Sequence, residues 1–355
     1  MKVRYAFMDV VRFVSMIGIV YYHMVVSLYL CGIRQYESIS PMFENKNMHV
    51  ATVGVGLFFM ISGAGLMLST KDKEHLNLKE YYLKRFLRVL VPFYLVYALY
   101  IVWFLIVTHQ GLGAIYDGDI KPISFIFTLL GMDAYISSFG IPTYSVGIGE
   151  WFLGALVMMY IIFPILRWAL LRNKWITLGC MSIYFIIIII VYPVFPFANV
   201  VPGFTNFLCK VYEFFLGMFL ITVVDKIPKW LKLYVTIPVI GFFLIYPLKL
   251  PINQNLMILI ENLAFMLLFM GLEGFFNKIP RVIKAVTACC GISYEFFLVH
   301  HKVIDYMTLQ HIGVPFSNKD ILVLFVEEFF VILLLTIIVK AILTAPRRIF
   351  GTHER

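Results

Sequence analysis

The chain has 355 residues, of which 61% are hydrophobic and 14% charged, and its mean hydropathy is +0.90. A soluble globular protein is about half apolar and about a quarter charged, so this composition excludes a soluble protein and indicates an all-α integral membrane protein. The net charge of +9 does not indicate a nucleic-acid partner, because the basic residues lie in short loops between apolar segments, where they orient a membrane protein.

Apolar segments recur along the whole chain, and many of them approach the roughly 20 residues that a helix needs to cross a bilayer. They predict about ten spanning helices in one polytopic domain over residues 1–355. The first segment carries ionisable groups and no small-residue cleavage site, so we expect it to be retained rather than removed as a signal peptide. The predicted spans are residues 8–30, 50–69, 88–108, 151–171, 175–194, 207–224, 232–248, 256–276, 286–308 and 321–343.

The charges of the loops predict the topology. If the 11-residue apolar stretch 122–132 does not cross, the loops rich in Lys and Arg all lie on one side of the membrane. Cytoplasmic loops carry the excess of Lys and Arg, so we expect both termini in the cytoplasm. Residues 109–150 then form a long excursion on the outer side, because so short a stretch cannot span the hydrocarbon core.

Ionisable residues interrupt the first predicted span. Arg12 and His23 are 11 residues apart, which is three turns plus about 20°, so they share one helix face about 16 Å apart along the axis. Arg12 can reach the inner headgroups and His23 can hydrogen-bond a neighbouring helix. Because ionisable residues inside a membrane usually mark a pathway or a reaction site, the shared face favours a functional role.

Five stretches in this order resemble the membrane acyltransferase-3 family, the polysaccharide O-acyltransferases. The segment DVVRFVSMIGIVYYH at residues 9–23 is similar to the first helix of the family, in which an arginine precedes a histidine by the same spacing. The other stretches are GLFFMISGAGLML at 56–68, YYLKRFLRVLVPFY at 81–94, EWFLGALVMMYIIFP at 150–164 and SYEFFLVHH at 293–301. Members with a fused esterase-like domain usually carry an acidic residue after the tryptophan of the fourth stretch; here it is absent, so the chain resembles a stand-alone member.

The resemblance implies acyl transfer from acyl-coenzyme A to a hydroxyl group of a glycan or of a lipid-linked sugar. It favours His300 over His301 as a second site residue, and successive residues on a helix point about 100° apart, so we expect only one of the two to face the core. Donor phosphates require cations, which Arg12, Arg85 and Arg88 supply near the predicted cytoplasmic face.

His23 is the best candidate base for such a transfer, since imidazole titrates near physiological pH. It can deprotonate the acceptor hydroxyl directly or carry the acyl group transiently, and the sequence does not decide between these routes. Glu150 and Trp151 are candidate acceptor-binding residues, although Glu150 also fits a solvated residue at the end of a helix. The cysteines show no metal-ligand spacing, and we expect no metal.

Transport of a lipid-linked glycan is the alternative function, because polar residues inside spanning helices also mark transport pathways. The two halves of the chain show no repeat of the kind that many transporters have. A receptor or scaffold is a further alternative. The bilayer and a glycan or lipid-linked sugar are the expected partners, in the plasma or inner membrane.

Overall fold

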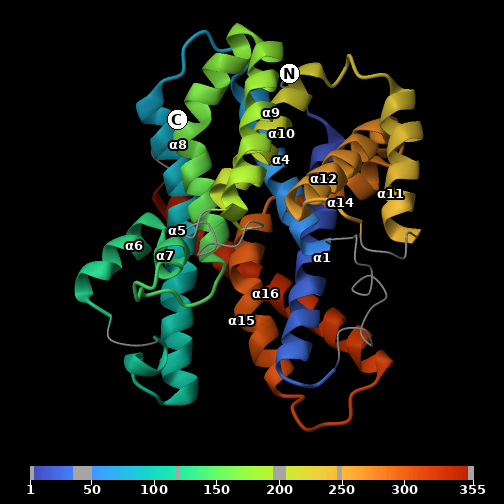
Figure 1. Cartoon of the computed structure of the whole chain (residues 1–355). Helices are drawn as coiled ribbons and strands as arrows, with labels where there is room; N and C mark the ends of the chain where they lie inside the picture. Colours follow the sequence, from blue (N-terminus) through green and yellow to red (C-terminus); the bar gives the residue numbers. More distant parts are fainter. Residues whose placement is uncertain (1–3, 35–49, 117–119, 195–204, 246–249, 351–355) are drawn as a thin grey trace. The chain divides into compact units, whose positions relative to one another are not determined.

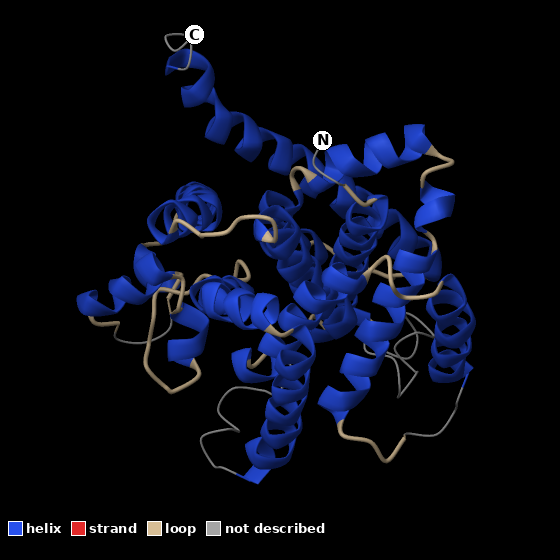
Figure 2. Cartoon of the chain, turned by 90° about the horizontal axis from the view of Figure 1, so that it is seen from above, coloured by secondary structure: helices blue, strands red, loops and turns tan. Residues whose placement is uncertain are grey.

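The structure is a computed structural model that describes residues 4–34, 50–116, 120–194, 205–245 and 250–350. Over these ranges every regular element is a helix and none is a strand (Figure 2). The prediction of an all-α membrane protein is therefore confirmed.

Two compact units divide the chain, and each is built from separated segments. Unit 1 comprises residues 1–22, 36–81 and 158–290, and unit 2 comprises residues 23–35, 82–157 and 291–355. Helices α1 (Ala6–Leu30), α5 (Leu78–Thr108) and α8 (Glu150–Arg172) contribute residues to both units. A functional site within either unit therefore combines residues that are far apart in sequence.

Seven helices within the described ranges are long and apolar enough to cross a membrane. They are α1, α5, α8, α4 (Val50–Thr70), α9 (Lys174–Val191), α12 (Gln254–Gly271) and α16 (Asn318–Phe350). The count rises to eight if α14 (Pro280–Cys290) and α15 (Ser293–Leu309), which together pass the same criteria, are taken as one broken span. This pair replaces the unbroken helix predicted at 286–308.

The other two predicted spans are also helical but shorter. The segment 207–224 forms α10 (Phe207–Val223), with 17 residues. The segment 232–248 forms a π-helical turn (Leu231–Val235) followed by α11 (Thr236–Ile245), and its residues 246–248 lie outside the described ranges. Among the described residues, length and composition thus support seven or eight crossings, compared with the predicted ten. The side of the membrane on which the termini lie stays a prediction.

In its described residues, the predicted outer excursion contains only short helices. Between α5 and α8 lie 3₁₀ turns at Leu112–Ala114 and Pro122–Ser124 and the helices α6 (Phe125–Leu130) and α7 (Asp133–Ser137). The stretch 122–132 therefore forms no spanning helix, as predicted, and α6 ends at Gly131 in the left-handed conformation, with φ of 68°. Residues 117–119 of the excursion lie outside the described part of the chain.

The core of unit 1 depends on close contact between α4 and α10, which lie side by side (Figure 1). A Cβ atom at Gly63 would overlap the carbonyl oxygen of Phe214, and one at Gly217 would overlap the carbonyl oxygen of Met60. Small residues let membrane helices approach until their backbones touch. The glycines on both helices are therefore required by the packing.

Replacement of Gly217 by alanine should destabilise the protein. The added methyl group has to displace a backbone carbonyl, and overpacking of this kind typically costs about 1–3 kcal/mol. Thermal unfolding in detergent should show a lower midpoint for Gly217→Ala than for wild type. Gly179→Ala on α9 is the matched control, because nothing lies within 4 Å of a Cβ atom there; equal midpoints for the two variants would contradict the packing argument.

Unit 1 also fixes the beginning of α1, because the carboxylate of Glu273 accepts hydrogen bonds from the backbone N–H groups of Ala6 (2.9 Å) and Phe7 (2.7 Å). The first N–H groups of a helix have no partner within the helix, and they carry a partial positive charge. Glu273 satisfies two of them with a negative charge, which anchors the helix that carries Arg12 and His23.

In unit 2, α15 packs against α16 through polar as well as apolar contacts. Lys340 Nζ lies 2.6 Å from Glu295 Oε1. At the other end of α16, the Arg34 guanidinium donates to the carbonyl oxygen of Phe316 (2.9 Å) and to Asn318 Oδ1 (2.5 Å). These contacts tie the chain that follows α1 to the start of α16, and so hold the end of α1 that carries His23 within unit 2.

Candidate functional site

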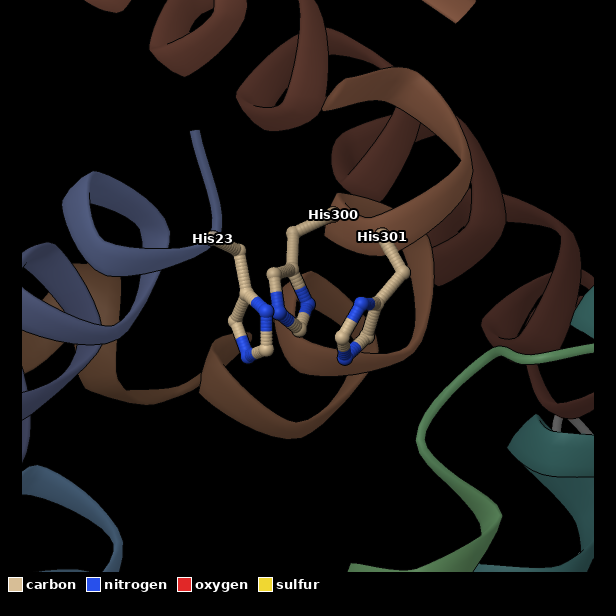
Figure 3. Close-up of side chains that lie close together, drawn as sticks. All are labelled: His23, His300 and His301. Carbon is tan, nitrogen blue, oxygen red and sulfur yellow. The ribbon is translucent and has the colours of Figure 1, made fainter. Parts of the chain in front are cut away.

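Three imidazole rings meet within unit 2. His23 comes from α1, and His300 and His301 come from α15 (Figure 3). The centroid of the His23 ring lies 5.1 Å from that of His300 and 4.0 Å from that of His301, and the last two lie 4.2 Å apart. We call these three residues the histidine cluster.

The structure corrects the expectation that only one histidine of α15 faces the core. His300 is buried and His301 is half-buried, and both rings pack against His23. Although successive side chains point about 100° apart, the His300 and His301 rings lie close enough together for the His23 ring to contact both. His301 therefore belongs to the site, although the sequence argument left it out.

A hydrogen bond fixes the His300 ring. Its Nδ1 bonds the carbonyl oxygen of Phe297 one turn earlier on α15. A carbonyl oxygen only accepts, so Nδ1 carries the proton and Nε2 presents its lone pair. The side chain is 1% exposed, and Nε2 is buried without a hydrogen-bond partner among the described residues. His300 thus offers a buried, oriented nitrogen lone pair.

The loop before α8 packs against the same turn of α15. The Phe152 and Phe297 rings lie 4.5 Å apart between centroids. Gly149 has φ of 96°, and a Cβ atom there would lie 2.6 Å from the Phe297 ring. Any other residue at position 149 would be strained and would press on the Phe297 ring, so this glycine allows the loop to approach the side chain of the residue that holds His300.

Glu150 holds this loop in place. Its Oε1 accepts hydrogen bonds from the backbone N–H groups of Val146 (2.8 Å) and Gly147 (3.0 Å), and the residue is 3% exposed. The interpretation of Glu150 as a solvated end residue is therefore wrong, because the loop folds back over the carboxylate. Trp151, the other predicted acceptor residue, is half-buried beside Phe152.

Lys302 follows the cluster directly in sequence, but its ammonium group is directed elsewhere. Its Nζ lies 5.0 Å from the centroid of the Tyr100 ring and 3.9 Å from Asp305 Oδ2. A cation over an aromatic face and near a carboxylate is stabilised by both. Lys302 therefore borders the cluster without entering it.

Arg12, a predicted phosphate ligand, lies in unit 1 and is part of an ion-pair network. Its guanidinium is 3.7 Å from Asp9 Oδ1. Asp9 Oδ2 also pairs with Arg4 (2.6 Å) and accepts a hydrogen bond from Thr287 (2.7 Å). Asp9 therefore orients two arginines near the start of α1, and the network carries one more positive than negative charge.

The other predicted phosphate ligands, Arg85 and Arg88, lie on the part of α5 that belongs to unit 2. Arg85 is half-buried and Arg88 is exposed. Within the described part of the chain, neither of them makes an ion pair. Both guanidinium groups therefore keep their hydrogen-bonding capacity for a ligand.

Sequence reasoning also missed Asp133, at the start of α7. The residue is 0% exposed; its Oδ1 accepts from Thr128 Oγ1 at 3.1 Å, and its Oδ2 is buried without a partner among the described residues. Burial raises the pKa of Asp133 to about 6. Asp133 directly follows the apolar stretch 122–132, and the sequence alone did not show that its carboxylate is covered.

Comparison with known protein families finds that the acyltransferase-3 family model, described as an acyltransferase domain, matches residues 5–345. The match includes both helices of the histidine cluster and all the predicted site residues. Neither the comparison with curated proteins nor that with solved structures finds a match.

Proposed function

The chain belongs to the acyltransferase-3 family of membrane acyltransferases, and from this premise we propose that it transfers an acetyl group from acetyl-coenzyme A to a hydroxyl group of a cell-surface glycan or of its lipid-linked precursor. The observation that carries the proposal is the histidine cluster, in which a histidine of α1 meets two of α15. The enzyme acts in the plasma or inner membrane, as one polytopic domain.

His23 is the proposed base or transient acyl carrier, and His300 is the second catalytic residue. In the direct route, an imidazole nitrogen takes the hydroxyl proton while the oxygen attacks the thioester carbonyl. The tetrahedral intermediate then expels the coenzyme A thiolate, which receives that proton. In the other route, His23 attacks first, forms an acyl-imidazole and releases the thiol before the hydroxyl attacks. General acid–base catalysis of this kind is typically worth about 10²–10⁴-fold in rate.

Arg12 in unit 1 is a proposed ligand of the donor phosphates, and Arg85 and Arg88 in unit 2 are each proposed as such on their own evidence. The support is the net positive charge around Arg12 and Asp9 and the exposure of Arg88. A guanidinium presents parallel N–H donors to a phosphate and binds it in a defined direction.

The acceptor is proposed to bind beside Trp151, at the loop that Glu150 organises. The support is the contact of this loop with Phe297, the residue whose carbonyl orients His300. In this proposal the Glu150 carboxylate, which binds the backbone of residues 146 and 147, positions the loop that receives the sugar.

The arginine-to-lysine variants should weaken donor binding. Arg12→Lys and Arg88→Lys keep the charge but lose the two-pronged hydrogen bonding, so the affinity for acetyl-coenzyme A should fall about tenfold if about 1.4 kcal/mol is lost. Titration of the donor into purified protein measures this. Arg281→Lys, at an exposed position of α14, is the control and should bind as wild type. Unchanged affinity in both Arg12→Lys and Arg88→Lys would remove these residues from the donor site.

The function itself is tested with purified protein and acetyl-coenzyme A that is labelled in the acetyl group. Release of free thiol together with transfer of label to a glycan acceptor supports the proposal. Mass analysis of the surface glycans of cells with and without the gene identifies the acceptor. If thiol release stays at the uncatalysed rate with every glycan fraction and the glycan masses do not differ, acyl transfer to glycans is excluded and transport of a lipid-linked glycan is the function to test next.

A further inference from the structure

The histidine cluster has the composition of a metal site. Each of its three side chains offers one ring nitrogen, and these nitrogens all lie within 4.8 Å of one another. We propose that His23, His300 and His301 bind a divalent first-row transition-metal ion, with Zn²⁺ as the first candidate. This replaces the expectation of no metal, which rested on the spacing of the cysteines.

The ligand chemistry selects the class of ion. Imidazole nitrogen suits zinc, copper, iron and nickel, whereas magnesium and calcium require oxygen ligands. Over the described part of the chain, the cluster contains three nitrogen ligands and no carboxylate. Three histidines leave one position of a tetrahedral ion open for water or another oxygen ligand, as in zinc sites that take part in reactions.

His300 shows the arrangement expected of a metal ligand. A histidine that binds a metal usually donates its other ring N–H to a carbonyl or carboxylate, which fixes the ring and the tautomer. His300 Nδ1 makes this bond to Phe297. Its Nε2 is buried and has no hydrogen-bond partner among the described residues, although a buried polar atom normally has one. A metal ion within the cluster would satisfy this nitrogen.

The distances allow a metal ion with small movements of side chains. A Zn–N bond is about 2.0–2.1 Å, so the nitrogens of a tetrahedral site lie about 3.4 Å apart. The ring nitrogens of the cluster lie at most 4.8 Å apart, so each pair has to approach by at most about 1.4 Å to bind a zinc ion. His23 and His301 are half-buried, and the proposal requires their side chains to rotate by this amount.

The positive charge that borders the cluster, on Lys302, has partners of its own. The nearest ammonium group in sequence, that of Lys302, lies over the Tyr100 ring and near the carboxylate of Asp305. These partners hold the ammonium group beside the cluster and stabilise its charge there. A cation in the cluster therefore gains three ligands without displacing a positive charge from among them.

Metal binding and the proposed base are alternative states of His23, because one lone pair cannot hold a metal ion and a proton at the same time. The competition between metal and proton rests on the proposed function, whereas metal binding rests on the geometry of the cluster alone. The test therefore uses metal content and spectra as its readouts, and transfer is assayed separately on metal-free protein.

The full chain is purified in detergent through a tag without histidines, stripped with a chelator and dialysed against Zn²⁺ or Co²⁺. We expect one ion per chain, and for Co²⁺ the visible absorption of a four-coordinate site. His23→Ala and His301→Ala should lower the affinity at least tenfold, because even the loss of a hydrogen-bond partner of a metal ligand typically costs about 10–100-fold. His75→Ala, which alters an exposed loop histidine, should bind as wild type.

Wild-type protein that takes up neither ion would overturn the proposal and leave the cluster as a set of hydrogen-bonding imidazoles. Equal affinities in wild type, His23→Ala and His301→Ala would overturn it as well, because the ion would then lie elsewhere. If His301→Ala does not fold, the Co²⁺ spectrum of wild type still distinguishes a four-coordinate site, which absorbs strongly, from a weakly absorbing six-coordinate site, and the latter counts against the cluster. If the protein takes up metal but its metal-free form fails with every glycan fraction, and the glycan masses of cells with and without the gene do not differ, the proposed function is refuted and the metal site is not.

Discussion

His23→Ala protein should lose acyl transfer while reaching the membrane in normal amount. His23 supplies the α1 nitrogen of the histidine cluster, and its ring contacts both histidines of α15. In the proposed reaction it takes the hydroxyl proton or carries the acyl group, so its removal should slow transfer about 10²–10⁴-fold. The protein fold should persist, because the side chain is half-buried and the rest of α1 keeps its packing.

Transfer and abundance have to be measured on the same membranes, so that loss of protein is not taken for loss of chemistry. His75→Ala is the matched control, because its side chain is 92% exposed in a loop and it should transfer as wild type. Donor titration adds a second readout. His23→Ala removes a reactive group and no phosphate ligand, so it should bind acetyl-coenzyme A nearly as well as wild type. Transfer at the wild-type rate by His23→Ala would end the assignment of His23 as base or carrier.

The helices of this protein could be predicted from the sequence, because hydrophobicity over about 20 residues decides whether a segment crosses. The lengths of some helices and the break within one of them were not predicted. The segment predicted at 286–308 is interrupted at residues 291–292, between α14 and α15. A helix can end at such a place without a proline, and a hydropathy window averages over the break.

The candidate site could be predicted only in part, because a site depends on contacts between helices as well as on the helices themselves. Arg12 and His23 lie on one continuous helix, and the position of a residue on a helix face follows from its number alone. Which neighbour that face meets depends on tertiary packing. His301 was missed for this reason, and Glu150 was interpreted wrongly because its partners, the N–H groups of residues 146 and 147, come from a loop without a sequence pattern.

Lys210 and Glu213 on α10 form the most deeply buried ion pair that the structure describes within unit 1. Their side chains are 2% and 4% exposed, and Lys210 Nζ lies 2.7 Å from Glu213 Oε1. Gly56 on α4 leaves room for the carboxylate, since a Cβ atom there would lie 2.7 Å from Glu213 Oε2. The spacing of three residues places both side chains on one face of the helix, a pattern that could have been noticed in the sequence.

Lys210→Met should therefore unfold at a much lower temperature than wild type, as should Glu213→Leu. Removal of one partner leaves the other as an unpaired buried charge, which typically costs about 3–5 kcal/mol, whereas replacement of both by apolar residues of similar volume is often neutral or stabilising. The double variant Lys210→Met/Glu213→Leu should thus recover most of the lost stability. Thermal unfolding of the three variants in detergent, analysed as a double-mutant cycle, measures this.

The matched comparison is the pair Lys302–Asp305 on α15, which has the same spacing but a longer distance of 3.9 Å and more exposed side chains, at 26% and 54%. Exposed pairs contribute about 1 kcal/mol or less, so Asp305→Asn should shift the midpoint far less than either single variant on α10. A double variant that is less stable than both single variants would mean that each side chain stabilises α10 independently. The two side chains would then stabilise the protein through contacts other than their ion pair. The loss of stability in the single variants would not be due to an unpaired charge in a low-dielectric interior.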